Sequence, residues 1–137
     1  MRGLSRGSVA ISPPVMKKLT ITSSNDDRNA SNAPEATGSR ICGSVTDQCA
    51  RQRVAPVAEE LDRAHRFPYE LVAELGELGL MGLPVPARWG GAGGDTLSYA
   101  IAVEELARID SSVAITVAAH TSLGTMPILL YGTDEQR

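Results

Sequence analysis

The chain has 137 residues, of which 42% are hydrophobic and 21% charged, and its formal net charge is −3. An acidic balance argues against nucleic acid as the main partner, because binding to phosphates requires a basic surface. No apolar run approaches the ~18–20 residues needed to cross a bilayer, so we expect no membrane span. The two cysteines, Cys42 and Cys49, form neither a metal-binding quartet nor a disulfide framework. These features predict a soluble, intracellular protein.

The first 50 residues differ in composition from the rest of the chain. They contain no aromatic residue and carry six basic and four acidic side chains, whereas residues 51–137 contain all five aromatic residues, seven basic side chains and twelve acidic ones. The first part cannot bury enough apolar surface to offset the entropy cost of ordering its backbone. We therefore expect a disordered leader over residues 1–45 and a folded domain over residues 46–137.

The extreme N-terminus has some features of a targeting segment. It contains basic residues and serines, and no acid occurs before Asp26, as in a mitochondrial transit peptide. However, Pro13 and Pro14 would break an amphipathic helix, and no apolar core of the kind a secretory signal requires is present. We expect an untargeted leader and a cytoplasmic protein, with the mitochondrial matrix as the alternative location.

Two helices are predicted at the start of the folded part. The first has an apolar stripe at alternating spacings of four and three residues, and Pro56 inside it predicts a kink or a new helix start. The second follows Pro68 and ends at Gly79. The predicted buried residues are Ala50, Val54, Val57, Leu61 and Ala64 in the first helix, and Leu71, Leu75 and Leu78 in the second.

Residues 80–94 are predicted to form a loop. Pro84 and Pro86 exclude a central strand, and the spacing of the following glycines does not match a dinucleotide-binding or P-loop motif. We interpret these glycines as a flexible turn that leads into the next helix.

Asp95 is predicted to cap that next helix, and Glu104 and Arg108 are spaced to form an ion pair on its surface. Asp110 and the two serines after it are predicted to separate this helix from the next element and to cap that element. The wide face predicted to be buried in the capped helix contains Leu97, Ala100, Ile101, Val103, Leu106 and Ala107.

Residues 113–123 carry no charge at all, so we expect a central helix buried on every side. Gly124 and Pro127 are expected to break this helix, with a short apolar helix following over residues 127–131. The sequence of residues 133–136 is a capping box, which marks the start of a helix that this chain does not contain. We therefore expect the chain to be a truncated protein.

Few side chains are candidates for chemistry. The two histidines, His65 and His120, have no Cys, Asp or Glu at ligand spacing around them. We interpret His120 as a buried histidine with one hydrogen-bond partner, the alternative being a contact to substrate or cofactor. Three glutamates at positions 70, 74 and 77 share one helix face and are interpreted as solvated. The residues alone predict a helical module without a visible active site.

Four stretches nevertheless resemble the acyl-CoA dehydrogenase family in order and in spacing. They are FPYELVAELGELGLMGLPVP (67–86) with RWGGAG (88–93), AVEELARIDSSV (102–113), AHTSLG (119–124) and PILLYGTDEQ (127–136). The family's first helix is also recognisable in RVAPVAEELDR (53–63), and upstream of about Arg51 the resemblance fails.

The resemblance implies an all-α fold, namely the N-terminal helical, bundle-like domain of an FAD enzyme with three domains. The family removes two hydrogens across Cα–Cβ of an acyl-CoA thioester, with a glutamate as base and the flavin as hydride acceptor. It also implies acyl-CoA and an electron-transfer flavoprotein as partners and a homo-oligomer, mostly a tetramer, for the whole enzyme. The flavin motif and the base are expected beyond Arg137, so we assign no catalytic, flavin-binding or metal-binding residue in this sequence.

The resemblance also implies a substrate pocket. The family helix that matches residues 113–123 borders the acyl chain with positions four apart, which are Ile115, Ala119 and Leu123 here. These residues share one helix face, and the alternative is that they simply pack in the core. For the chain as a whole, two hypotheses stay open: a segment of an acyl-CoA dehydrogenase that is inactive alone, or a non-catalytic helical interaction module or product of a disrupted gene.

Overall fold

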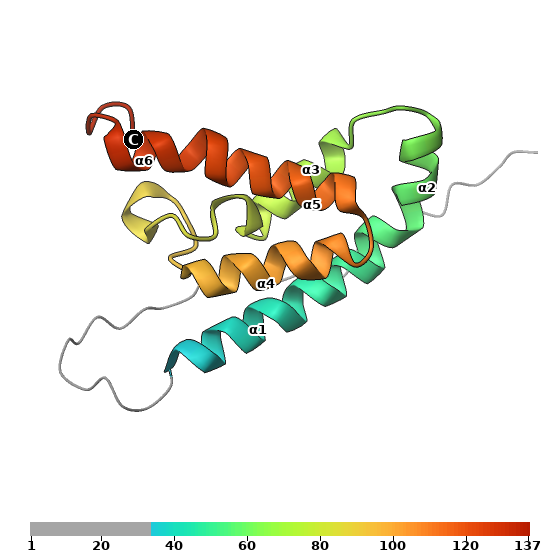
Figure 1. The fold of residues 1–137 in the computed structure, drawn as a ribbon, viewed down its shortest axis with the longest axis horizontal. Helices are drawn as coiled ribbons and strands as arrows, with labels where there is room; N and C mark the ends of the chain where they lie inside the picture. The colour runs from blue at the N-terminus through green and yellow to red at the C-terminus, as the bar shows by residue number, and fades with distance from the viewer. Residues whose placement is uncertain (1–33) are drawn as a thin grey trace, which may run out of the picture.

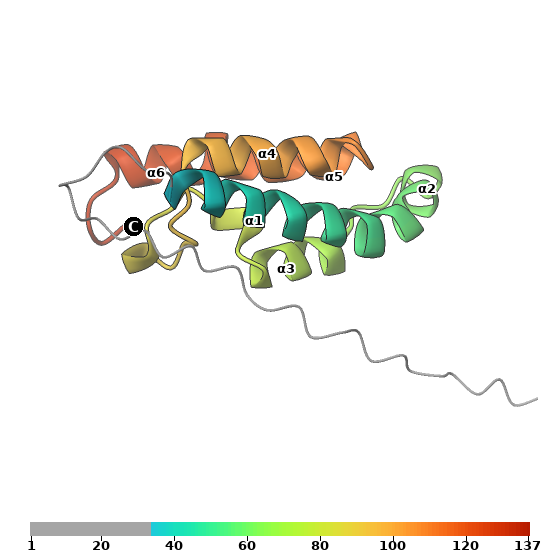
Figure 2. The ribbon, with the colours of Figure 1, turned by 90° about the horizontal axis from the view of Figure 1, so that it is seen from below.

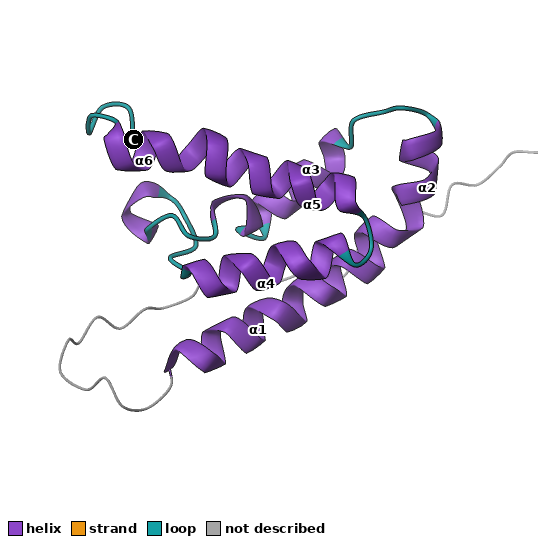
Figure 3. Ribbon diagram, in the orientation of Figure 1, coloured by secondary structure: helices purple, strands orange, loops and turns teal. Residues whose placement is uncertain are grey.

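The structure, a computed structural model, describes residues 34–137, and over this range the chain consists of helices and loops without a strand (Figures 1 and 3). The all-α prediction is confirmed for this range. Most of the expected leader lies outside the described residues. In chain order the elements are α1 (Pro34–Cys49), the π-helical turn η1 (Ala50–Val54), α2 (Ala55–Arg63), α3 (Tyr69–Glu77), the 3-10 turns η2 (Leu80–Gly82) and η3 (Ala87–Trp89), α4 (Thr96–Ala107), α5 (Ser111–Ala119), the π-helical turn η4 (His120–Thr125) and α6 (Met126–Tyr131).

The long helices pack side by side around a leucine-rich core. Helix α1 runs beside α4 in the same direction, and α5 with α6 returns antiparallel to α4 (Figure 1). Helix α3 lies on the side of α1 away from α4, whereas the turn η2 that follows it contacts η4 (Figure 2). Burying these large aliphatic side chains is the main favourable contribution to folding. The largest fully buried apolar side chains are Leu75, Leu80, Leu83, Leu106, Val54, Val113 and Val117.

Helix α1 begins well before the expected domain boundary at residue 46. It starts at Pro34, so the boundary at Thr46 falls inside the helix. Cys42 and Cys49 are fully buried and stand seven residues apart, which continues the apolar stripe two turns towards the N-terminus. The Cys42 thiol also approaches the Ser98 carbonyl of α4 at 3.5 Å. Packing against α4 therefore stabilises a stretch whose composition alone predicted no helix.

Pro56 and Pro127 do not end the helices that contain them. Each lies two residues after a π-helical turn, η1 before Pro56 and η4 before Pro127. A proline ring in a regular helix clashes with the carbonyl four residues earlier and leaves it without a donor. A π turn widens the helix by one residue, which relieves this conflict. At Pro56, where the sequence predicts a kink or a new helix start, the structure has a π turn that ends two residues before the proline. At Pro127 the predicted break is wrong, because the helix continues through the proline.

As a result, Ser111–Tyr131 is one helix of 21 residues with a mean hydropathy of 1.6. It is long and apolar enough to cross a membrane by length and composition, so the expectation that no segment meets these criteria is wrong. One such helix is weak evidence for a span, because helices that pack against other protein parts meet the same criteria.

This helix is also not buried on every side, contrary to expectation. Val113, Ala114 and Val117 face the core, whereas Ile115 and Leu123 are 65% and 77% exposed. In α4 the predicted burial is confirmed for Leu106, and Ile101 and Val103 are half-buried. It is wrong for Leu97, Ala100 and Ala107, which are exposed. The apolar sequence of both helices thus includes residues that find no partner within the described part of the chain.

The segment between α3 and α4 contains no strand, as predicted, but it is held in place by its own backbone. Gly79 ends α3 with a left-handed φ of 87°. The N–H groups of Ala92, Gly93 and Gly94 then donate to the carbonyls of Gly82, Val85 and Leu83 at 3.0, 2.9 and 2.8 Å. This closes a compact loop, so the interpretation as a flexible turn is wrong for these residues.

Candidate functional site

The outward face of α5, η4 and α6 carries five of the eight exposed large apolar side chains found in the described residues. Between Ser111 and Tyr131 there is no charged side chain, and exposed large apolar residues occur in α5, in η4 and in α6. Monomeric soluble domains rarely expose contiguous apolar surface of this extent unless it binds something. The exposed large apolar residues of this helix are Ile115, Leu123, Ile128, Leu130 and Tyr131.

The helix that carries this face is anchored at both ends of α5. At its N-terminus the Asp110 carboxylate accepts from the N–H groups of Ser112 and Val113 at 2.7 and 3.0 Å. Burial of Asp110 raises the pKa of its carboxyl, but these hydrogen bonds outweigh the burial and hold the pKa below the usual 3.8. At its C-terminus the Tyr99 hydroxyl of α4 donates to the Ala118 carbonyl at 3.0 Å. The anchoring predicted for Asp110 is confirmed.

The three predicted pocket residues all lie on the outward side of the helix. Ile115 and Leu123 are exposed and Ala119 is half-buried. Ile115 and Leu123 therefore do not pack into the core of the described part, which was the alternative interpretation. The three positions form an apolar strip with the smallest side chain in its middle.

Neither histidine lies in a buried site. His120 is exposed, and its Nε2 is 3.3 Å from the Thr125 hydroxyl, so the expectation of a buried histidine is wrong. His65 is exposed and ends α2 with a φ of 50°. In residues 34–137, no three His, Cys, Asp or Glu side chains gather as a metal site would require. Burial raises the pKa of the Cys42 and Cys49 thiols, which disfavours the reactive thiolate.

The charged side chains form pairs rather than a reactive cluster. Glu74, predicted to be solvated, pairs bidentately with Arg53 across the α3–η1 contact, with 2.6 Å between Glu74 Oε2 and Arg53 Nε. The hydrogen bond to Glu74 and the negative charge of Glu74 raise the pKa of the Arg53 guanidinium. A cavity of about 250 Å³ lies beside this pair, lined by residues of η1, α2 and α3.

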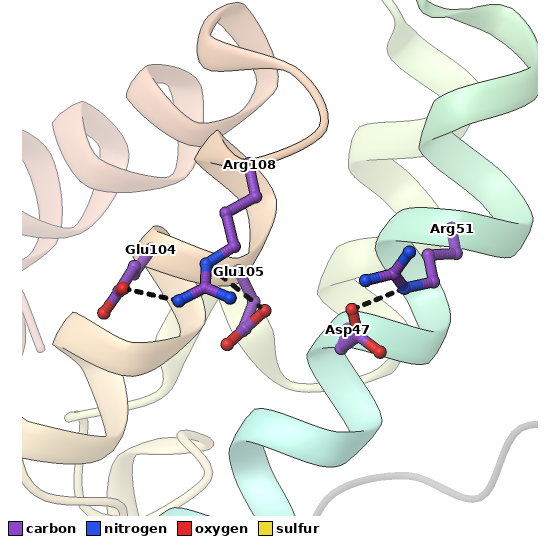
Figure 4. Close-up of polar contacts among 5 residues, drawn as sticks. All are labelled: Asp47, Arg51, Glu104, Glu105 and Arg108. Atoms are coloured by element: carbon purple, nitrogen blue, oxygen red, sulfur yellow. Dashed lines mark hydrogen bonds and ion pairs between the residues drawn. The ribbon is translucent and has the colours of Figure 1, made fainter.

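On α4 the predicted Glu104–Arg108 pair is confirmed at 2.9 Å, and an Asp47–Arg51 pair lies on the neighbouring helix surface at 2.7 Å (Figure 4). These four side chains are mostly exposed. Exposed pairs of this kind contribute little to stability and offer no unpaired group for chemistry.

The described residues do not fit a flavin on their own. The glycines of the loop before α4 are occupied in closing that loop and do not follow a strand, as a dinucleotide cradle requires. The buried polar side chains Thr46, Ser98 and Thr121 lie within the helix packing, and every buried side-chain nitrogen or oxygen in the described residues has a partner. Residues 34–137 therefore support no chemical step through a flavin by themselves.

Sequence reasoning missed two residues that shape this helix, Tyr99 and Thr121. Tyr99 is the only aromatic residue of α4, and nothing in its local sequence indicates a hydrogen bond to the next helix. Thr121 is 1% exposed and its hydroxyl donates to the Met81 carbonyl at 3.2 Å. The nearest sequence signal is Pro127, six residues downstream, which in isolation predicts a helix break and not a π turn.

Comparisons with known proteins agree with this fold. Residues 41–137 match the family of the acyl-CoA dehydrogenase N-terminal domain. An acyl-CoA dehydrogenase of Bacillus subtilis is 46% identical over 88 residues, which cover 64% of this chain and 23% of that protein.

The chain also resembles solved structures. Butyryl-CoA dehydrogenase from Megasphaera elsdenii superposes with a TM-score of 0.67 and 38% identity, over 72% of this chain and 26% of that one. A chain from a structure of the electron transferring flavoprotein of Acidaminococcus fermentans superposes with a TM-score of 0.71 and 35% identity, over 79% and 28%.

The chain thus spans about a quarter of the length of the proteins it matches. The family match begins at residue 41, within α1, and continues to residue 137, so it includes the anchored apolar helix. The chain therefore belongs to the acyl-CoA dehydrogenase family and carries the family's N-terminal domain.

Proposed function

We propose that this chain supplies one wall of the acyl-binding pocket in an FAD-dependent acyl-CoA dehydrogenase and is inactive by itself. The observation that carries the proposal is the outward apolar strip of Ile115, Ala119 and Leu123 on a helix anchored from its other side. In this proposal the base and the flavin site belong to parts of the enzyme outside residues 34–137. The flavin, when bound, supplies the hydride acceptor for α,β-dehydrogenation.

The strip suits an acyl chain for physical reasons. An aliphatic chain gains roughly 0.8 kcal/mol for each methylene removed from water, provided that the wall is apolar and uncharged. The face between Ser111 and Tyr131 meets this condition because it has no charged residue. Because the half-buried Ala119 has a smaller side chain than Ile115 and Leu123, we expect a shallow depression there that can admit the acyl chain.

The proposal is tested by changing the depth of this depression. We suggest a chimera in which the 88 matching residues of this chain replace their counterparts in the Bacillus subtilis enzyme. The variant is Ala119→Leu in this chimera. Filling the depression should cost long acyl-CoA substrates about 1–3 kcal/mol in kcat/KM and leave short ones nearly unchanged. The matched control is Ala107→Leu, the same change at an exposed alanine of α4. An unchanged length profile for Ala119→Leu would show that residue 119 does not border the substrate.

The remaining partners follow from the same proposal. Likeness to a chain from a structure of an electron transferring flavoprotein supports a protein of that kind as electron acceptor. We also propose that the whole enzyme is a homo-oligomer. Reduction of purified electron-transfer flavoprotein by the chimera and butyryl-CoA would test the first point, and light scattering of the chimera would test the second.

A second candidate function uses the same surface without catalysis. The exposed residues of α5–α6 could equally dock another protein if the chain acted as an interaction module. The coding sequence that follows Arg137 separates the two proposals. A continuation that encodes a flavin-binding domain, in frame or after a frameshift, supports the dehydrogenase, and an unrelated continuation supports the module.

A further inference from the structure

The two π turns have the same backbone hydrogen bond, in the same position relative to the proline that follows each of them. The N–H of Ala55, directly before Pro56, donates to the Ala50 carbonyl, and the N–H of Met126, directly before Pro127, donates to the Thr121 carbonyl. Both bonds span five residues, where a regular helix spans four. The repetition in two unrelated helices indicates that the proline causes the widened turn.

In the second case the widened turn changes the direction of Leu123. An α-helix turns about 100° per residue, so Leu123 would lie about 80° around the axis from Ile115 in a regular helix. A π turn advances by roughly 85° per residue, because its hydrogen-bonded ring is one residue larger. Over the four steps from Ala119 this brings Leu123 back to within about 20° of Ile115.

This direction is opposite to the buried face of the same helix. Val113, Val117 and Thr121 are all buried, whereas Ile115 and Leu123 are both exposed. The π turn therefore gathers the outward residues into one narrow strip, with Ala119 between them, instead of letting them wind around the helix.

Thr121 fastens this turn to the rest of the domain. Its buried hydroxyl donates to the Met81 carbonyl in η2, forty residues away in sequence, at 3.2 Å. The Thr125 hydroxyl in addition donates to the His120 carbonyl at 3.2 Å, a bond that also spans five residues but begins one residue earlier than the backbone bond. The turn is held from inside the domain as well as within the helix.

We propose that Pro127 and Thr121 are positioning residues for acyl-chain selection. Pro127 enforces the π turn, Thr121 sets its rotation against η2, and together they align Leu123 with Ile115 and Ala119. The proposal rests on the function proposed above, since it takes these three residues as the pocket wall. Neither positioning residue needs to touch the substrate.

The test uses the same chimera with Pro127→Ala, which restores the missing N–H and removes the ring. Its crystal structure reports the register directly: the Met126 N–H donates to the Thr121 carbonyl in a π turn and to the Ser122 carbonyl in a regular helix. We expect the regular register and a loss of roughly tenfold in kcat/KM for acyl chains that reach Leu123, with short chains unaffected. The matched control is Pro56→Ala, the same change at the other π turn, which should leave the length profile unchanged.

Thr121→Val and Thr121→Ser provide a second, independent pair of variants. Valine has the shape of threonine but cannot donate to Met81, so it should shift the length profile in the same direction as Pro127→Ala. Serine keeps the donor and should restore the original profile, which a merely space-filling role for Thr121 would not produce.

The outcomes separate this proposal from the one on which it rests. An altered profile for Ala119→Leu together with an unaltered profile for Pro127→Ala in the regular register would overturn the positioning role alone. A π turn that persists in Pro127→Ala would overturn the causal role of the proline. No effect of Ala119→Leu would instead refute the pocket wall itself.

Discussion

Gly91 should be one of the least replaceable residues of the domain, because its missing side chain lets the loop before α4 close. A Cβ added at Gly91 would lie 2.1 Å from the Val85 carbonyl oxygen and 2.4 Å from the Val85 Cβ. The oxygen cannot yield easily, since it accepts the Gly93 N–H at 2.9 Å in the bond that closes the loop. Overpacking costs typically 1–3 kcal/mol, and a clash with backbone belongs at the upper end. We therefore expect Gly91→Ala to destabilise the domain by about 3 kcal/mol.

The neighbouring glycine provides the control. Gly90 has a φ of +84°, and a Cβ there would meet nothing within 4 Å. Gly90→Ala should therefore cost only the left-handed backbone strain of about 1–2 kcal/mol. Urea denaturation of the 137-residue chain measures the free energy of unfolding of both variants. Far-UV circular dichroism reports on the helices, and the fluorescence of Trp89, the only tryptophan, reports on the loop. If Gly91→Ala were no more destabilising than Gly90→Ala, the close approach to Val85 would not exist in solution.

Two further predictions concern the cap of α4 and the exposed apolar face. Hydrogen bonds from the Ser98 side chain and N–H hold the pKa of Asp95 below its usual 3.8. Its stabilising effect should therefore be complete above about pH 4 and lost as the pH falls through the folded-state pKa. Accordingly, Asp95→Ala should cost about 1 kcal/mol at pH 7 and less at pH 3, as measured by urea denaturation at both values, whereas Asp95→Asn should cost little at pH 7. A cost for Asp95→Ala that is independent of pH would contradict the cap. The isolated chain should associate with rising concentration through the α5–α6 face, and Leu123→Glu should reduce this in light scattering while Ala107→Glu does not. A monodisperse monomer would contradict the prediction.

The local signals of helix capping could be read from the sequence with good accuracy. Asp95 and Asp110 cap α4 and α5 as predicted, because a carboxylate directly before an apolar helix serves the free N–H groups there. Gly79 ends α3 in the left-handed conformation for an equally local reason. Such features depend on a few neighbouring residues, so the sequence is sufficient to predict them.

The continuity of the long helix could not be predicted from the same kind of signal. Pro127 is a helix breaker in isolation, and only the π turn, fastened to η2 through Thr121, accommodates it. The start of α1 was missed for a related reason, since its stability comes from contacts with α4 that composition does not reveal.

The candidate site exposes a different limit of sequence reasoning. Apolar residues that face the core and apolar residues that face another domain have the same composition and spacing. The charge-free stretch of α5 therefore predicted burial on all sides, while the structure divides it into an inner face with Val117 and an outer face with Ile115 and Leu123. The positions of the three pocket residues came from family resemblance, and their exposure came from the structure.

The central claim is that the outer face of α5 and η4 contacts the acyl chain of a substrate. The most direct test is a crystal structure of the chimera with the matching Bacillus subtilis segments, in complex with a saturated acyl-CoA analogue that cannot be dehydrogenated. The proposal predicts acyl carbon atoms within about 4.5 Å of Ile115, Ala119 and Leu123. An acyl chain bound elsewhere, with this face covered entirely by protein, would contradict the claim.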